Sequence, residues 1–499
     1  MSSRRDGWRT AAVRCLTVLM LGMVAPVQAG LWLEPGDTAL RSDIQRLDDA
    51  GLLHAPVTTW PIYAPDLVHA LDLPEDRDTL PPAVRQALSR VQSRLHGAMQ
   101  YGLHDPAYQM RVASDPIRVR GFEDTPRQEG EVGTEAAWVG TRFAVKLDAS
   151  VTNERDAPGE DRASLDGSYA MMAVGNWLIT AGAQDRWWGP GWDGSLILGN
   201  NARPVPGIAI DRKLSKPFET PWLSWIGPWR LNLFAGRLES ERFIPDPYLL
   251  TARLTVRPLE GLEIGFSRTA QWGGDGRPQD LKSLVDLALG DDNVGATDPG
   301  ADEPGNQLGG VDFRWRSPLG ELPYAIYGQV IGEDEAGGLP SRSFGMAGVE
   351  TWGRLESLEA NVRLRLEAAD TAVEFYQDDV GYNTAYNHHI YRDGYRFHRR
   401  SLGHSMDNDG RMVGLGATVL TDAGRNWHAW VKRAELNRDG AGLNTVSDRD
   451  VDWWASGVSM EMDVWGGRLG TGLYLDAAEP AGDSRDWSGG VFVDWTHHW

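Results

Sequence analysis

From about residue 113 to the C-terminus, apolar and polar residues alternate with a period of two. The clearest run is 358–368, in which every even-numbered residue is apolar and every odd-numbered residue is polar. The same alternation occurs in 311–316 and 458–464. A period of two places successive side chains on opposite faces of a strand. The pattern therefore predicts a long series of β-strands, each with one apolar and one polar face.

Three features favour a transmembrane barrel over a soluble β-sandwich, which also shows this alternation. The repeats extend over about 380 residues, more strands than one ordinary sandwich holds. The polar face carries charges of both signs, such as Arg363 and Glu367, which suit a hydrated lumen. The last strand has one apolar face and a terminal aromatic residue, made by Val491, Val493, Trp495 and Trp499. We predict an all-β transmembrane barrel over residues 113–499; a soluble edge strand that ends in tryptophan by chance is the alternative.

Residues 30–112 follow the period of a helix instead. One helix is expected to start at Asp37 or Thr38 and to end at Gly51, and a second to start at Pro81-Pro82. Their apolar residues fall on one face each, namely Leu40, Ile44 and Leu47 in the first and Val84, Leu88, Val91 and Leu95 in the second. A short third helix near Pro65 completes a predicted helical bundle. A further helix is expected within the stretch 277–290, in a long outer loop, because Leu281, Leu284, Val285 and Ala288 fall on one face.

Residues 1–29 have the pattern of a cleavable export signal. Four arginines precede the apolar run Leu16 to Val24, and Val27-Gln28-Ala29 is a small-residue cleavage site. The apolar run is too short to serve as a transmembrane anchor, which is the alternative. We therefore predict that the mature protein starts near residue 30.

The charge and the cysteine content exclude several classes of function. The chain carries a net charge of −21, and residues 1–29 contribute +3 of it, so about −24 remains after processing. Binding to nucleic-acid phosphates requires clustered Lys and Arg, so no nucleic-acid partner is expected. Cys15 is the only cysteine and lies within the signal, which leaves no disulfide, no thiol nucleophile and no thiolate metal ligand.

The stretch 186–204, called here the tryptophan-rich stretch, has three tryptophans, a Gly-Pro-Gly turn, two asparagines and two arginines. Indole faces stack on sugar rings, while Asn, Asp and Arg match hydroxyl and carboxylate groups. Its candidate ligand-binding residues are Trp187, Trp188, Trp192, Asp193, Asn200, Asn201 and Arg203. The alternative is a folded plug whose tryptophans and asparagines pack inside the barrel.

A second cluster, 391–400, is basic and aromatic within an acidic chain. Arginine pairs in a forked geometry with carboxylates such as those of uronate or pyruvate groups, and tyrosine stacks on rings. The candidates from this region are Arg392, Tyr395, Arg399, Arg400 and His404. The alternative is that these arginines pair with carboxylates of the lumen or of the loops and hold the loops closed.

Several segments also carry a family resemblance. They are 43–45, 56–61, 187–206, 217–225, 267–280, 331–337, 386–396 and 400–409. The chain resembles the Wzi family of capsule-assembly outer-membrane proteins over nearly its whole length after the signal. The resemblance implies a monomeric barrel of about 18 antiparallel strands, with the helical bundle at its periplasmic end and long extracellular loops. It also implies a lectin-like role in attaching or assembling capsular polysaccharide, without catalytic residues.

No pattern predicts catalysis, a cofactor or a metal. Ser195 lacks the second glycine of a nucleophile elbow, and the histidines have no metal-site spacing. The acidic segments 407–410 and 291–293 could hold a calcium ion, but neither fits the spaced calcium-loop pattern. We therefore predict a non-enzymatic outer-membrane protein whose partners are acidic polysaccharide and membrane lipid. A porin-like channel is the alternative function, and a lumen filled by paired charges argues against it.

Overall fold

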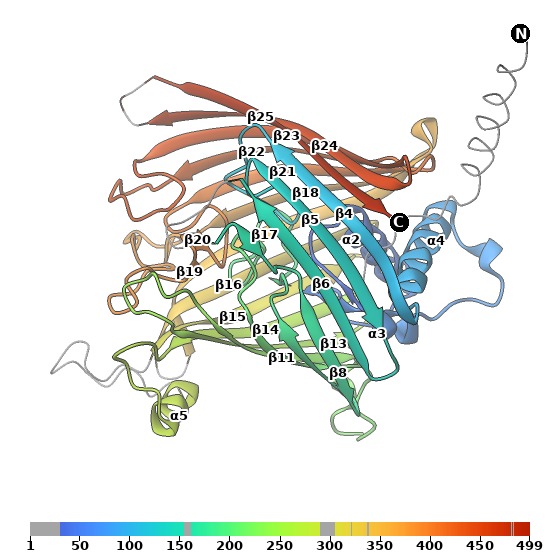
Figure 1. Ribbon diagram of the computed structural model, residues 1–499, viewed down its shortest axis with the longest axis horizontal. Helices are drawn as coiled ribbons and strands as arrows, with labels where there is room; N and C mark the ends of the chain where they lie inside the picture. The colour runs from blue at the N-terminus through green and yellow to red at the C-terminus, as the bar shows by residue number, and fades with distance from the viewer. Residues whose placement is uncertain are drawn as a thin grey trace, which may run out of the picture.

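A computed structural model of the chain describes residues 30–153, 161–289, 305–320, 322–336, 339–480, 482 and 484–499. The expected export signal and the possible calcium loop 291–293 lie outside these residues. The described part of the chain forms one closed antiparallel barrel with a filled interior (Figure 1).

The barrel has 18 strand positions, because the short strands β7 and β8 both pair with β6 and together occupy one position. Strand β25 pairs with β4 and closes the barrel, so the prediction of about 18 antiparallel strands is confirmed. The strands are β4 (Gly102–Ala113), β5 (Gly130–Val139), β6 (Phe143–Thr152), β7 (Ala163–Ser164), β8 (Tyr169–Val174), β9 (Trp177–Gly182), β11 (Gly207–Arg212), β12 (Trp229–Arg237), β13 (Tyr248–Leu259), β14 (Leu262–Trp272), β15 (Gly305–Arg316), β16 (Tyr324–Ala336), β17 (Leu339–Leu355), β18 (Ala360–Asp370), β21 (Arg411–Thr421), β22 (Asn426–Leu436), β23 (Val451–Val464), β24 (Gly467–Pro480) and β25 (Asp486–His498).

The two faces of each strand follow the alternation of the sequence. In β18, Leu364 and Leu366 are 45% and 47% exposed on the outer surface, whereas Arg363, Arg365 and Glu367 are at most 2% exposed. In a transmembrane barrel the exposed apolar side chains face lipid, and the charged side chains are enclosed in the lumen. Pairing between neighbouring strands satisfies the backbone hydrogen bonds, as a membrane interior requires.

Strand β4 corrects the expected boundary at residue 113. The strand begins at Gly102, so the barrel starts within the region assigned to the helical bundle. Pro106 interrupts the strand signal, because proline usually marks an edge or an irregularity. The structure accommodates it where the register between β4 and β5 shifts, between His104 and Ala107.

Three helices lie at one end of the barrel, together with the short turns between strands (Figure 1). They are α2 (Thr38–Asp49), α3 (Ala64–Ala70) and α4 (Pro82–Ala98). The side chain of Asp37 accepts a hydrogen bond from the Leu40 amide and caps α2, as expected from the sequence. None of the described helices is long and apolar enough to cross a bilayer. The opposite end carries the longer loops, with α5 (Leu281–Leu289) and the hairpin of β19 (Arg396–Phe397) and β20 (Arg400–Ser401).

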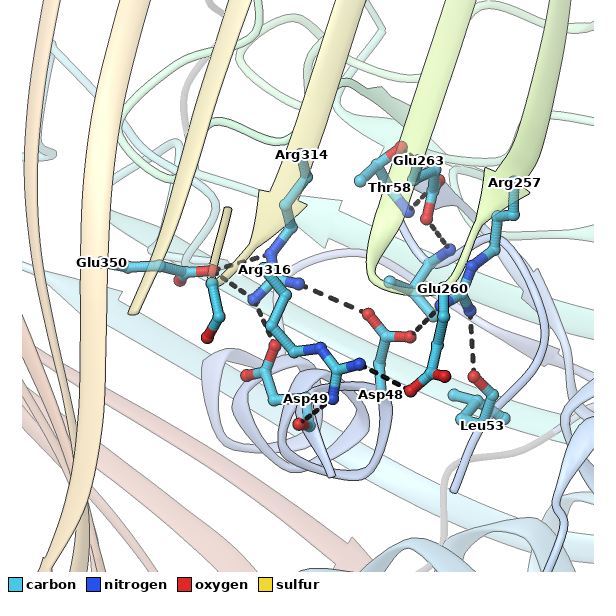
Figure 2. A network of polar contacts seen from close by, with 12 residues as sticks. Asp48, Asp49, Leu53, Thr58, Arg257, Glu260, Glu263, Arg314, Arg316 and Glu350 are labelled. Carbon is cyan, nitrogen blue, oxygen red and sulfur yellow. Dashed lines mark hydrogen bonds and ion pairs between the residues drawn. The ribbon is translucent and has the colours of Figure 1, made fainter. Parts of the chain in front are cut away.

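Arginines of the barrel wall hold α2 inside the lumen, as Figure 2 shows. Asp49 lies 2.8 Å from both Arg314 and Arg363, and Asp48 pairs with Arg257. Arg314 also lies 2.6 Å from Glu350 of β17. All of these charges are buried, so each depends on its partners for compensation. The helix is therefore a structural part of the barrel interior.

We expect Asp49→Asn to destabilise the folded barrel, because it leaves two buried guanidinium groups short of a counter-charge. Removal of one partner from a buried pair costs about 3–5 kcal/mol. The temperature at which the compact band unfolds on a semi-native gel measures this loss. Asp78→Asn is the matched control, since Asp78 forms an exposed pair with Arg85 and should shift the unfolding temperature little. Equal shifts for both variants would contradict the role of the lumen pairs.

Candidate functional site

The tryptophan-rich stretch folds inside the barrel. Trp187 and Trp188 form β10, which pairs with Thr59 and Trp60 of β2 (Thr59–Trp60). The three indoles, including that of Trp192, are at most 2% exposed. Their faces are therefore unavailable to a sugar in this structure, and the arrangement is that of the plug alternative.

The tryptophans instead surround a buried cation of helix α2. The guanidinium of Arg41 lies 4.2 Å from the ring centre of Trp192 and 4.4 Å from that of Phe122, and it donates to the Pro190 carbonyl at 2.6 Å. Burial lowers the pKa of Arg41 to about 9. Aromatic faces compensate a desolvated guanidinium through the ring quadrupole. The Gly-Pro-Gly turn thus fixes the stretch onto α2.

The polar residues of the stretch also point to protein partners. Asp193 lies 3.3 Å from Lys432 and 3.8 Å from Arg365 on the barrel wall. The side-chain amides of Asn200 and Asn201 donate to backbone carbonyls, and Arg203 pairs with Asp166 at 2.7 Å. These contacts stabilise the barrel interior. The Asp, Asn and Arg side chains of the stretch therefore bond to the protein itself and do not point outward.

An outer segment, residues 386–410, packs on top of the tryptophan-rich stretch. The hydroxyls of Tyr386 and Tyr395 donate to the carbonyls of Leu196 and Ile197 at 2.6 and 2.8 Å. Tyr395 and His404 are fully buried, which corrects the expectation that they meet a ligand directly. Burial lowers the pKa of His404 to about 3, so its imidazole is neutral at physiological pH. The outer segment and the stretch form one packed unit.

A basic cavity of about 680 Å³ opens above this unit at the long-loop end of the barrel. It brings together three exposed arginines, Arg118, Arg392 and Arg399, from two distant parts of the chain. None of the three forms an ion pair with a carboxylate among the described residues. Arg400 also lines the cavity and donates to the Arg127 carbonyl at 3.1 Å. The acidic residues that line it are Glu239, Glu241 and Asp393.

The β19–β20 hairpin positions one of these arginines. Its two-residue turn, His398-Arg399, has φ angles of 46° and 63°, the left-handed region that non-glycine residues seldom adopt. Below the turn, Arg396 is buried and pairs with Asp407 at 2.9 Å. The buried pair anchors the hairpin, and the turn presents Arg399 at the cavity rim. Such conformations persist only when the surroundings fix them, and they are frequent at binding sites.

An exposed aromatic ring lies beside the cavity. Arg392 stacks over Phe243 at 4.3 Å from the ring centre, and Phe243 is 57% exposed. The Phe243 amide donates to the Asp393 carboxylate at 2.7 Å, which fixes the ring relative to the basic loop. Sequence reasoning missed Phe243 and Arg118, because each is an isolated residue and only the barrel topology brings them to this cavity.

The possible calcium ligands have protein partners instead. Asp407 pairs with Arg396 and accepts from Thr445, while Asp409 accepts from the Asn383 amide. No group of three or more His, Cys, Asp or Glu side chains suited to a metal ion occurs within the described part of the chain. These carboxylates hold the outer segment together.

A closed antiparallel barrel with a lipid-facing apolar band, a charged interior and long loops at one end defines a bacterial outer-membrane barrel. The sequence model of the capsule assembly protein Wzi family matches residues 111–475, so this chain belongs to the Wzi family of capsule-assembly proteins.

Two known proteins resemble the chain over most of its length. An uncharacterized 55.8 kDa protein from the cps region of Klebsiella pneumoniae is 30% identical over 482 residues, covering 95% of this chain and 92% of that protein. The structure of Wzi from Escherichia coli is 28% identical, with a TM-score of 0.81, covering 94% of this chain and 99% of the other. That protein is described as an outer-membrane protein involved in group 1 capsule assembly and as a carbohydrate-binding β-barrel.

We expect His404 to make stability depend on pH. Its folded pKa lies below the ordinary value of 6.5, so the unfolded chain takes up a proton that the folded chain excludes. Stability therefore falls as the pH drops below about 6.5, by about 2 kcal/mol at pH 5 relative to pH 7. Unfolding temperatures of the wild type and His404→Asn at both pH values test this.

The variant should lose part of this pH dependence, because asparagine does not titrate. His69→Asn is the control, since His69 is exposed on α3 and its replacement should leave the dependence unchanged. If His404→Asn keeps the full difference between pH 7 and pH 5, another group is responsible.

Proposed function

We propose that this protein is a lectin-like component of the outer membrane that binds acidic capsular or extracellular polysaccharide and helps to attach or assemble it at the cell surface. The observation that carries the proposal is the basic cavity in a chain of net charge −21. There Arg118, Arg392 and Arg399 are exposed and have no carboxylate partner among the residues that the structure describes. Cations left unpaired at one place on an acidic protein favour an anionic ligand.

The chemistry of the cavity suits carboxylated sugars. Guanidinium groups form paired hydrogen bonds with a carboxylate, and an exposed ring such as Phe243 offers a face to the apolar side of a sugar. Each exposed contact is weak, at about 1 kcal/mol or less. A polymer repeats its charged unit, so the effective concentration of the next unit compensates for weak single contacts. The cavity therefore favours retention of a long polymer over tight binding of one sugar.

The orientation in the membrane is part of the proposal. Outer-membrane barrels have short periplasmic turns and longer extracellular loops. On that basis α2, α3 and α4 lie at the periplasmic end and the basic cavity faces outward. Residues 1–29 would be removed during export, and the protein would act as a monomer without a cofactor or catalytic activity.

We expect the combined replacement of Arg118, Arg392 and Arg399 by Gln to weaken binding of a uronate-containing polysaccharide at least tenfold, because three charge contacts of the cavity are lost. Binding of the purified polymer to detergent-solubilised protein, measured at low and moderate salt, is the assay. Arg425→Gln is the matched control, since Arg425 is exposed in the turn between β21 and β22 at the opposite end. Binding unchanged by the triple replacement would exclude this cavity.

In cells that make a surface polymer, we expect deletion of the gene to leave synthesis intact and to release polymer into the medium. The ratio of cell-bound to released polymer measures attachment. Complementation with the triple-arginine variant should restore the barrel in the membrane but not the retention of the polymer. An unchanged ratio in the deletion strain would refute the attachment role.

A porin-like channel is the alternative function. The interior is occupied by buried ion pairs, such as Lys146 with Glu34 and Glu135, and by the tryptophan-rich stretch. A cavity of about 220 Å³ remains inside the barrel, lined by residues of strands β4 to β6 and β23 to β25. Stable ion conductance of the purified protein in planar bilayers would favour a channel over the binding role.

A further inference from the structure

The longest connection between β-strands at the helix-bearing end, residues 213–228, joins β11 to β12 and carries two exposed indoles. Trp222 and Trp225 are 72% and 68% exposed, on either side of the start of a short 3-10 helix, Ser224–Ile226. Most other tryptophans at this end belong to strands or to the interior. Exposure of two indoles to water on one loop is unfavourable, because the free energy falls when a large apolar surface is removed from water.

The base of this loop is fixed to the barrel. The Ser215 amide donates to Asp66 of α3 at 2.8 Å, and Arg212 donates to the Lys216 and Trp229 carbonyls at 3.0 and 2.8 Å. Phe218 stacks on Trp229 with ring centres 4.6 Å apart. These contacts hold the loop in one position, so the exposure of its tip is a defined feature of the surface.

The strands beside the loop carry exposed apolar residues at the same end. Trp177 of β9 is the register partner of Arg212, where β11 enters the loop. Leu259 at the end of β13 and Trp315 of β15 continue the row along the barrel rim. These residues belong to the outer, lipid-facing surface, and tryptophan is enriched where such a surface meets the lipid headgroups. The indoles of the loop are continuous with this band.

The charges of the loop agree with a phospholipid neighbour. Lys213 and Lys216 precede the indoles, and Glu219 is the only carboxylate among residues 213–228. Lysines beside a membrane surface favour the phosphate groups of lipids, and indoles favour the boundary between headgroups and acyl chains.

We propose that residues 213–228 form a membrane-interface anchor, in which Trp222 and Trp225 insert into the phospholipid headgroup region of the leaflet at the helix-bearing end. The anchor would set the height of the barrel rim against the bilayer. It would also hold α3 there, because Asp66 of α3 bonds to the base of the loop.

The test uses single cysteines, which is direct because the chain after the export signal has no cysteine. Trp222→Cys and Trp225→Cys carry a spin label in nanodiscs of phosphatidylethanolamine and phosphatidylglycerol. Relaxation by oxygen, which concentrates in the membrane, is compared with relaxation by a water-soluble nickel chelate. Leu366→Cys provides the lipid reference, and Ala423→Cys, in the exposed turn between β21 and β22, provides the water reference at the same end.

We expect labels at 222 and 225 to show an oxygen-to-nickel accessibility ratio several-fold above that at 423 and below that at 366. A ratio equal to that at 423 would place the loop in water and overturn the proposal. Low accessibility to both reagents would also overturn it, because a second protein surface would then cover the indoles. The label is the same at every site, so its own hydrophobicity cannot produce the difference.

Discussion

The structure depends on the neutralisation of charge inside a closed barrel. Alternation along each strand gives one face to lipid and directs the other inward, so arginines such as Arg257, Arg314 and Arg363 are buried. A buried guanidinium is tolerated only with carboxylate or backbone acceptors around it. Helix α2 supplies these acceptors through Asp48 and Asp49. The N-terminal helix and the barrel wall are therefore mutually dependent, and neither satisfies its polar groups alone.

The same requirement connects the helix-bearing end to the outer cavity. Arg41 of α2 is held by the tryptophan-rich stretch, and Tyr386 and Tyr395 of the outer segment bond to the next turn of that stretch. The β19–β20 hairpin is part of this outer segment, and its turn presents Arg399. The basic cavity thus has a packed floor that extends to α2. For the binding role that we propose, a rigid floor would limit the entropy lost when the cavity engages a polymer.

The fold was largely predictable from the sequence because periodicity is a local property. The alternation in β18, the caps of α2 and the last strand each depend on residues that are close in the chain. The site was predictable only in part. Indoles suit a sugar ring and a guanidinium equally well, and the partner of Trp192 is Arg41, far away in the sequence. The grouping of Arg118 with Arg392 likewise arises only when the barrel closes.

Pairing, rather than residue type, separates the structural arginines from those suited to a ligand. Arg396 and Arg399 lie three residues apart in one hairpin, yet the first is buried against Asp407 and the second is exposed without a carboxylate partner within the described residues. In an acidic chain, nearby carboxylates are abundant, so an arginine that remains unpaired reflects the geometry of the loop that carries it. A cluster of such arginines at one cavity attracts anions locally even though the protein as a whole repels them. Because solvent ions screen exposed charges within about 10 Å at 0.1 M salt, only a polymer segment that enters the cavity experiences this attraction fully.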